Sequence, residues 1–421
     1  MDKTEQLIKV INFWQESALR NNLFKRNLVE KINLKDKEVI DILGARRVGK
    51  SSVLKLIIKE LKNNNWLYIN FEDPFFVKNR NSSIIEELTE TYKNHFNSSL
   101  HYLFFDEIQN IKNWESVIRK FRDGTDYKIF ITGSSSKMLS GELATLLSGR
   151  HFSYKLLPFS FKEYLEFKNI LFEKQKDFVL NKEKIIKFFN NYLNIGGFPE
   201  IVITENKELL KQYFNDVVEK DIIARHNIKD REVLEKMAFF LLSNSAKIIS
   251  IASLKKAYDI SYQKTVNYLK YFKESFIIFD IPKFSYSLKE QQKSQKKIYS
   301  LDTGLSNNVA FKFSEDRGRV LENCVFLELK RKESDIYYFK NNVSEVDFVV
   351  KKSNGYVDLI QVVWDLNEDN KNRELNGFKE ALKKIKKVEN LIILTNDQDG
   401  ELQLGKRKIQ FKPVYKWLLS F

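Results

Sequence analysis

Short apolar runs that end in glycine or polar residues recur through the first 160 residues of the chain. The runs are Val39 to Leu43, Trp66 to Phe71, Tyr102 to Phe105 and Lys128 to Gly133. Stretches with helical spacing of apolar residues separate them, such as Val53 to Leu61 and Ser82 to Phe96. Continuous apolar strands alternating with helices are typical of a buried parallel sheet. The pattern therefore predicts an α/β fold for this part of the chain.

The pattern becomes helical over residues 161–225 and then changes to helices followed by a strand pair. The expected helices are Val233 to Leu242, Ile251 to Tyr258 and Ser261 to Phe272, and the expected strands are Phe276 to Phe279 and Lys297 to Leu301. A polar stretch, residues 289–296, lies between the two strands. This order predicts a helix-turn-helix with a hairpin wing.

Beyond residue 315 helices and strands mix again. The expected helices are Val320 to Lys332 and Glu374 to Lys387, and the expected strands are Ile336 to Phe339, Glu345 to Lys351, Tyr356 to Val363 and Leu391 to Thr395. A chain of 421 residues is too long for one ordinary core, so several domains are expected.

Composition narrows the class of protein. The single cysteine, Cys324, excludes an intramolecular disulfide framework and a cysteine-based zinc site, and the four histidines lack ligand spacing. Residues 1–20 carry charges within an amphipathic pattern, so they predict neither a signal peptide nor a membrane anchor. No apolar run approaches the roughly 20 residues of a membrane span. We therefore expect a cytoplasmic protein with no membrane contact.

The first chemical motif follows the first apolar run. Residues 44–51 complete the pattern G-x-x-x-x-G-K-[ST], between a predicted strand and a predicted helix. Glycines let backbone N–H groups converge on phosphate oxygens, while Lys50 reaches the β/γ-phosphates and the Ser51 hydroxyl ligates Mg²⁺. The predicted ATP-binding residues are Gly44, Ala45, Arg46, Arg47, Val48, Gly49, Lys50, Ser51 and Ser52.

A second motif ends the third apolar run with two acids, Asp106 and Glu107. Acids at the carboxyl end of a parallel strand lie where open α/β sheets bind ligands. We expect Asp106 to hold Mg²⁺ through its water shell and Glu107 to polarise the attacking water. The next strand ends in Ser134, Ser135 and Ser136, and the Ser134 hydroxyl is a candidate sensor of the γ-phosphate. Glu72 and Asp73 end another strand, where they either face the nucleotide or are solvated.

These motifs together resemble the AAA+ branch of P-loop ATPases, in which the acid directly after the Walker B aspartate is the catalytic base. Further motifs are LSGR at residues 147–150, LPFSF at 157–161 and GGFP at 196–199. With them the chain resembles a family of prokaryotic ATP-binding proteins that have an AAA-type core, a winged-helix segment and a nuclease-like C-terminal domain. The domains that the patterns and the resemblance imply are N-terminal helices at 1–37, an AAA+ type P-loop core at 38–160, a helical lid at 161–228, a winged-helix-like domain at 229–312 and a degenerate PD-(D/E)XK nuclease-like domain at 313–421.

AAA-type ATPases commonly need a guanidinium near the γ-phosphate, and Arg150 is the candidate for that role. Whether it acts in its own subunit or in a neighbour's stays open. An arginine salt-bridged at a domain junction is the alternative interpretation, and Arg46 and Arg47 inside the loop are alternative sources of the charge.

Charge suggests a polyanionic partner, since the formal net charge is +15. Residues 229–312 contain 15 Lys and Arg against 8 Asp and Glu, a net of +7. The expected DNA contacts on the second helix and the wing are Gln263, Lys264, Asn267, Lys270, Lys293, Lys296 and Lys297. The alternative is that this segment binds protein and its lysines are a solvated surface.

The C-terminal pattern resembles the PD-(D/E)XK nuclease fold, with Asp347 on one strand and Gln361 on the next. In active members of that fold the second strand supplies an acid and, two residues later, a lysine. Here those positions hold Gln361 and Val363, so we expect no nuclease activity, although Glu322, Glu345 and Asp347 are acidic.

Three functions follow from these observations. The favoured one is an Mg²⁺-dependent ATPase that acts as a switch or remodeller on DNA. The second is an ATP-dependent nuclease that uses Glu322, Glu345 and Asp347. The third is a nucleotide-gated protein scaffold without nucleic-acid contact.

Overall fold

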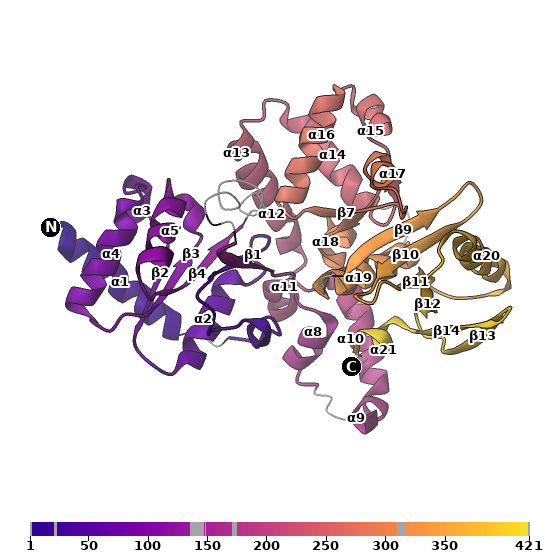
Figure 1. Cartoon of the computed structure of the whole chain (residues 1–421), viewed down its shortest axis with the longest axis horizontal. Helices are drawn as coiled ribbons and strands as arrows, with labels where there is room; N and C mark the ends of the chain where they lie inside the picture. Colours follow the sequence, from indigo (N-terminus) through magenta and orange to yellow (C-terminus); the bar gives the residue numbers. More distant parts are fainter. Residues whose placement is uncertain are drawn as a thin grey trace. The chain divides into compact units, whose positions relative to one another are not determined.

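The structure, a computed structural model, describes residues 2–20, 23–134, 147, 149–170, 175–309, 316–332 and 334–419. Its contacts separate the chain into two compact units, Met1–Leu157 and Pro158–Phe421 (Figure 1). Ser135, Ser136 and Ser148, which belong to motifs discussed above, lie outside the described residues.

The first unit is built on a five-stranded parallel sheet in the order β2-β3-β4-β1-β5. Its strands are β1 (Val39–Leu43), β2 (Trp66–Asn70), β3 (Tyr102–Asp106), β4 (Lys128–Gly133) and β5 (His151–Lys155). The first four confirm the strands expected from the apolar runs, and β5 was not expected. Strand β4 lies between β1 and β3, so the strand that precedes the phosphate-binding motif does not touch the strand that ends in the two acids.

Helices connect these strands in the alternating order that the sequence predicts. They are α1 (Lys3–Leu19), η1 (Val29–Lys31), α2 (Lys50–Leu61), α3 (Phe75–Lys78), α4 (Ser83–His95), η2 (Ile108–Asn110) and α5 (Trp114–Gly124).

Helix α1 covers the edge of the sheet. The Gln15 side chain accepts a hydrogen bond from the Tyr68 backbone N–H at 3.0 Å and donates one to the Trp66 carbonyl at 2.8 Å. These are backbone groups of the edge strand β2 that no neighbouring strand pairs, and an unpaired edge invites association. Gln15 therefore closes β2 as a further strand would.

The second unit begins with a helical segment. Its helices are α8 (Phe161–Phe167), α9 (Gln175–Leu180), α10 (Lys182–Ile195), α11 (Pro199–Thr204), α12 (Glu208–Asp216), the π-helix η3 (Val217–Ile223) and α13 (Ala224–His226). Helix α10 packs against α18 (Thr303–Asn308) and α19 (Arg317–Arg331). The helices expected as a lid therefore share a compact unit with the C-terminal segments.

A helix–strand–helix–helix–strand–helix–strand order follows. The elements are α14 (Arg231–Ser243), β6 (Ile248–Ile249), α15 (Ile251–Tyr258), α16 (Tyr262–Glu274), β7 (Ile278–Pro282), α17 (Leu288–Lys293) and β8 (Lys296–Ser300). The three strands form an antiparallel sheet in the order β6-β8-β7. The expected helices and strand pair are confirmed, but the polar stretch expected as an open wing contains helix α17, because Ser287 caps it by accepting from the Glu290 N–H.

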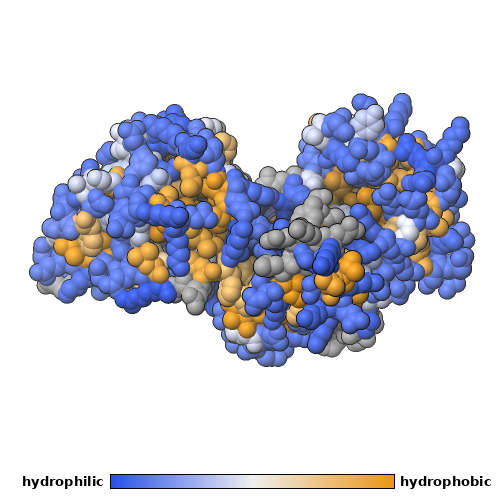
Figure 2. All heavy atoms as spheres, turned by 90° about the horizontal axis from the view of Figure 1, so that it is seen from below, coloured by the Kyte–Doolittle hydropathy of each residue, from blue (hydrophilic) through white to orange (hydrophobic). Residues whose placement is uncertain are grey.

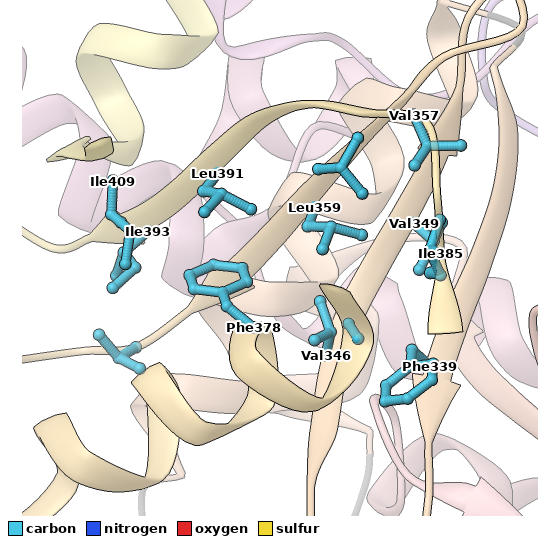
Figure 3. Close-up of a cluster of buried hydrophobic side chains, with 13 residues drawn as sticks. Phe339, Val346, Val349, Val357, Leu359, Phe378, Ile385, Leu391, Ile393 and Ile409 are labelled. Carbon is cyan, nitrogen blue, oxygen red and sulfur yellow. The ribbon is translucent and has the colours of Figure 1, made fainter. Parts of the chain in front are cut away.

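The remaining residues form a six-stranded mixed sheet in the order β13-β14-β12-β11-β10-β9. Its strands are β9 (Asp335–Lys340), β10 (Glu345–Lys351), β11 (Val357–Val362), β12 (Val388–Thr395), β13 (Gly400–Leu404) and β14 (Arg407–Pro413), with helices α20 (Glu368–Lys384) and α21 (Val414–Leu419). Figure 3 shows Phe378 of α20 facing Leu359 of β11 and Val346 of β10 within a buried cluster. Helix α20 thus covers one face of this sheet with apolar side chains.

The backbone of the GGFP motif packs closely against the side chain of Asp302. A side chain at Gly196, which has φ +78°, would meet Asp302 Oδ1 at 1.9 Å, and the Gly197 N–H donates to Asp302 Oδ2 at 2.7 Å. Asp302 Oδ1 also accepts from the Leu305 N–H at the start of α18. Burial raises the pKa of Asp302 to about 6. Gly196 is required because the backbone approaches the Asp302 carboxyl group directly, and Gly197 because an added Cβ would collide with the Phe159 carbonyl oxygen.

On the face drawn in Figure 2, hydrophilic residues predominate and hydrophobic residues form scattered groups. Across the part of the chain that the structure describes, no helix combines the length and the apolar character needed to cross a membrane.

Candidate functional site

The phosphate-binding motif forms a loop between β1 and α2. Gly44 leaves β1 so close to β5 that an added Cβ would lie 2.4 Å from the Leu156 carbonyl oxygen. Gly49 adopts φ +96° directly before α2, and Arg47 is also left-handed at φ +64°. These turns lead the loop into the N-terminus of α2. Backbone N–H groups at a helix N-terminus attract anions.

A buried arginine from the N-terminal segment holds this loop. Arg26 is 3% exposed, and its guanidinium donates to the Val48 carbonyl and to the Leu157 carbonyl, each at 2.7 Å. No sequence motif marks Arg26. Its guanidinium ties the loop to the segment that follows β5.

Lys50 begins α2 and turns its side chain back into the loop. Its ammonium lies 3.0 Å from Glu107 Oε1 and donates to the Ala45 carbonyl at 3.1 Å. Lys50 is 4% exposed and Glu107 is 7% exposed, so the pair is shielded from solvent. The loop and the acidic strand end, which the sequence places 57 positions apart, therefore meet.

Asp106 is fully buried at the end of β3. Its Oδ2 accepts from the Tyr68 hydroxyl at 2.9 Å and from the Asn70 amide at 3.2 Å, and Ser51 hydrogen-bonds to the same carboxyl group. Burial raises the pKa of Asp106, and the charge of Glu107 adds to this effect against the hydrogen bonds. The contact with Ser51 brings together the two predicted Mg²⁺ ligands.

Thr132 of β4, which was not expected from the sequence, connects the two acids. Its hydroxyl donates to Asp106 Oδ1 and accepts from the Glu107 backbone N–H at 2.9 Å. Glu107 itself has a left-handed backbone with φ +52°. Burial disfavours the charge of Glu107, but the Lys50 ammonium prevails and holds the pKa of that carboxyl below its usual range. A polar side chain near the end of an otherwise apolar strand was the available signal.

Ser134 lies at the end of β4 and is fully buried. Gln109 connects it to the acids, since its amide donates to Glu107 Oε2 and lies 3.5 Å from Ser134 Oγ. Ser134 is thus close to the predicted base, through Gln109, while Thr132 makes the direct contacts.

The arginine candidates lie in different places. Arg46 of the loop pairs with Glu72 at 3.1 Å, so Glu72 faces the loop, whereas Asp73 accepts from the Trp14 indole at 3.0 Å. Arg150 precedes β5, where its carbonyl accepts from the Val39 N–H and its side chain lies 3.6 Å from Asp123. Because β1 and β5 are parallel and Val39 pairs with His151, Arg150 lies at the amino edge of the sheet, about 20 Å along the strands from the phosphate loop. It does not join the Lys50 site of its own chain.

The lysines predicted to contact DNA differ in how exposed they are to solvent. Lys270 of α16 and Lys293 of α17 are exposed. Lys264 is half-buried and pairs with Asp230, and Lys296 donates to the Gln291 carbonyl at 2.7 Å. The prediction for Lys297 was wrong, because this residue is 2% exposed and its side chain points into the C-terminal domain.

A second polar site lies in that domain. A cleft of about 580 Å³ is lined by Glu322 of α19, Glu345 and Asp347 of β10, Gln361 of β11 and Glu374 of α20, among others. The Gln361 side chain accepts from the Asp347 N–H at 2.7 Å and donates to Glu374 and to the Glu345 carbonyl. The amide therefore uses both its donor and its acceptor to join β10, β11 and α20. Val363 is buried at 5% exposure.

Family comparisons divide the chain into three parts. Residues 36–165 match an AAA domain, and residues 186–316 and 317–416 match two domains of unknown function, DUF8612 and DUF4143. The first match covers β1 to β5 and both acidic and phosphate-binding motifs, so the chain contains a P-loop domain of the AAA class.

The chain is similar over most of its length to proteins of Methanocaldococcus jannaschii and Haemophilus influenzae. The uncharacterized protein MJ1544 of Methanocaldococcus jannaschii is 36% identical over 96% of this chain and 93% of its own length. An uncharacterized protein of Haemophilus influenzae is 29% identical over 85% of this chain and 91% of its own. Among solved structures, AMPPCP-bound DnaA from Aquifex aeolicus aligns with 59% of this chain and 86% of its own, at 15% identity and a TM-score of 0.25.

Proposed function

Because this chain belongs to the family of the Methanocaldococcus jannaschii relative MJ1544, with an AAA domain at residues 36–165, we propose that it is an Mg²⁺-dependent ATPase that acts as a nucleotide-controlled switch. The observation that carries the proposal is the convergence of Lys50, Ser51, Asp106 and Glu107 on one buried point.

The donor set fits a nucleoside triphosphate with Mg²⁺. The loop presents backbone N–H groups at a helix N-terminus together with one ammonium, Lys50, which suits the β- and γ-phosphates. A serine hydroxyl next to a buried carboxylate supplies the oxygen ligands that Mg²⁺ prefers. Bound Mg²⁺ would neutralise charge on the phosphates, with Ser51 and Asp106 as the residues that hold it.

Glu107 is the proposed general base. Its lowered pKa keeps the carboxylate ionised, and an ionised carboxylate can accept a proton from the attacking water. Thr132 fixes its backbone and Gln109 contacts its carboxylate, so both act as positioning residues.

The same contacts suggest how nucleotide controls the site. The Lys50 ammonium already contacts Glu107 Oε1 and the Ala45 carbonyl, so phosphate oxygens would compete with Glu107 for its charge. Nucleotide binding would therefore draw Lys50 away from Glu107 and release the base when its substrate arrives. In this scheme the ion pair restrains water activation until the nucleotide is bound.

We propose DNA as the partner of the segment around α15 and α16. The helix–strand–helix–helix–strand order from α14 to β7, with β8 pairing with β7 after the short helix α17, supports a winged-helix interpretation in which α16 faces a groove. Three exposed lysines of this segment, Lys255 of α15, Lys270 of α16 and Lys293 of α17, suit phosphate contacts rather than base readout. A nucleotide-gated protein scaffold is the alternative if this surface binds protein.

One experiment tests both levels of the proposal. ATP hydrolysis is measured with Mg²⁺ in the presence and absence of duplex and single-stranded DNA, while the DNA is followed on gels. Hydrolysis that DNA stimulates supports an ATPase switch on DNA. Hydrolysis that is indifferent to DNA favours the scaffold, DNA cleavage favours the nuclease alternative, and the absence of ATP binding would overturn the ATPase proposal itself.

A further inference from the structure

The most unusual charged group of the second unit is the Lys297 ammonium. It lies 2.8 Å from Glu322 Oε1, 2.9 Å from Glu345 Oε1 and 2.8 Å from Asp347 Oδ1. The lysine comes from β8, whereas the three acids come from α19 and β10. A cation from one segment is thus surrounded by three carboxylates from another.

The geometry of β8 explains why this lysine is buried while its neighbour is not. Adjacent residues of a strand point to opposite faces. Lys296 turns outward to the Gln291 carbonyl and remains half-buried, so Lys297 must turn inward. An inward lysine needs partners that compensate its charge, and the carboxylates of α19 and β10 provide them.

The surroundings hold the ammonium in place. Tyr299, two residues further along β8, donates its hydroxyl to Glu322 Oε1 at 2.7 Å and stacks on Phe326 with a centroid distance of 4.1 Å. The Glu345 carboxylate is shared with Lys340, whose ammonium lies 3.1 Å from Oε2. The aromatic rings of Tyr299 and Phe326 therefore lie on one side of the cluster, and the acids line the cleft on the other side.

The charges of the cluster nearly balance. Burial opposes the charge of Lys297, but the three carboxylates raise the pKa of this ammonium well above its usual range. Burial, reinforced by Asp347, raises the pKa of Glu322 to about 8 against the opposing charge of Lys297. The ammonium groups of Lys297 and, at the rim, Lys340 offset the charges of the acids.

We propose that Lys297 is the built-in cation of this cluster: its ammonium takes the position at which the three carboxylates would otherwise bind a divalent metal ion. Carboxylate oxygens converging on one point are the ligands of Mg²⁺, Mn²⁺ and Ca²⁺ in proteins. The lysine lies within 2.9 Å of one oxygen of each acid and so occupies the point on which these three oxygens converge. The arrangement also ties β8 to the C-terminal sheet, because the acids lose their counter-charge if β8 moves away.

The test is Mn²⁺ binding by the full-length protein without nucleotide, measured by electron paramagnetic resonance of free Mn²⁺. We expect Lys297→Met to gain one site that binds Mn²⁺ at least tenfold more tightly than wild type does. The gained site should disappear in the double variant Lys297→Met with Asp347→Asn. The matched control is Lys340→Met, which removes an exposed lysine from the same acidic group and should gain no such site.

A folded Lys297→Met variant without a new site would overturn the proposal, as would a wild-type site that Asp347→Asn removes. If the variant does not fold alone, it is refolded with and without Mn²⁺. Rescue by Mn²⁺ that requires Asp347 supports the proposal, since metal then replaces the missing ammonium, and failure of Mn²⁺ to rescue counts against it.

Discussion

Lys50 and Glu107 form a buried ion pair, with the lysine Nζ 3.0 Å from the glutamate Oε1. The pair joins the first residue of α2 to the residue after β3, and the strand between their two strands, β4, contributes Thr132 to the same group. The cation expected to bind phosphate is thus in contact with the expected base. Each of the two residues limits what the other can do, and substitutions separate their roles.

Glu107→Gln should bind ATP at least as tightly as wild type and hydrolyse it about 10² times more slowly or worse, because Lys50 is no longer held by a carboxylate and the base is lost. Fluorescent-nucleotide binding and single-turnover hydrolysis measure the two quantities. Glu60→Gln, an exposed change on α2, is the control and should alter neither. Normal hydrolysis by Glu107→Gln would assign the base to another residue.

Thr132→Val should lower the hydrolysis rate by about tenfold or more and destabilise the first unit by about 1–3 kcal/mol, because Asp106 loses a donor and the Glu107 N–H loses its acceptor. The dissociation constant for ATP should change much less than the rate. Thr89→Val removes another buried threonine hydroxyl, one that donates to the Ile85 carbonyl, and should affect stability alone. Equal rates in both variants would contradict the positioning role of Thr132.

Replacing Lys255, Lys270 and Lys293 together by alanine should weaken DNA binding to all sequences alike. The slope of log affinity against log salt should become shallower by up to about three units, one for each lost phosphate contact. Anisotropy titrations between about 50 and 200 mM salt measure the slope. Replacing Lys379, Lys384 and Lys387 by alanine removes the same charge from the C-terminal domain. This control should leave the salt slope unchanged. Indifference to the first set would favour the protein-scaffold alternative.

Glu322 should make the second unit less stable at alkaline pH. Its folded-state pKa of about 8 lies above the ordinary value of 4.5, so its stabilising contribution is complete below about pH 4.5 and is lost as the pH rises through about 8. The groups that face it are Lys297, Tyr299 and Asp347. The thermal unfolding temperature of Glu322→Gln should therefore fall less between pH 6.5 and pH 9 than the unfolding temperature of wild type does. Parallel curves for the two proteins would show that Glu322 does not titrate in this range.

Gly196→Ala should destabilise the second unit by about 4 kcal/mol or more, since the methyl group would meet the Asp302 carboxyl group at 1.9 Å in addition to the cost of a left-handed backbone. Gly355→Ala is a matched control, with φ +79° against +78° and no atom within 4 Å of the added Cβ. It should cost only about 1–2 kcal/mol. Urea unfolding measures the difference, and similar losses for both variants would contradict the close approach at Asp302.

The sequence by itself determined the local elements of the first unit and the residues of its motifs. An apolar run, a glycine loop and a helix are adjacent in the chain, so Gly44 to Ser51 form a phosphate-binding geometry through local backbone conformation. The second motif is equally local, because Asp106 and Glu107 end a strand whose apolar residues require burial. Neither motif needs information from a distant part of the chain.

Tertiary structure alone decided which side chains surround these motifs. The position of β4 between β1 and β3 brings Thr132 to both acids, and strand order is set by packing of the whole sheet rather than by any one segment. Strand direction places Arg150 at the opposite edge from Lys50. Lys297 is the clearest example of a residue whose environment only the tertiary structure decided. In the sequence it is one of two adjacent lysines near a polar stretch. Its burial depends on carboxylates from α19 and β10, and a lysine can be buried only where distant residues provide opposite charges.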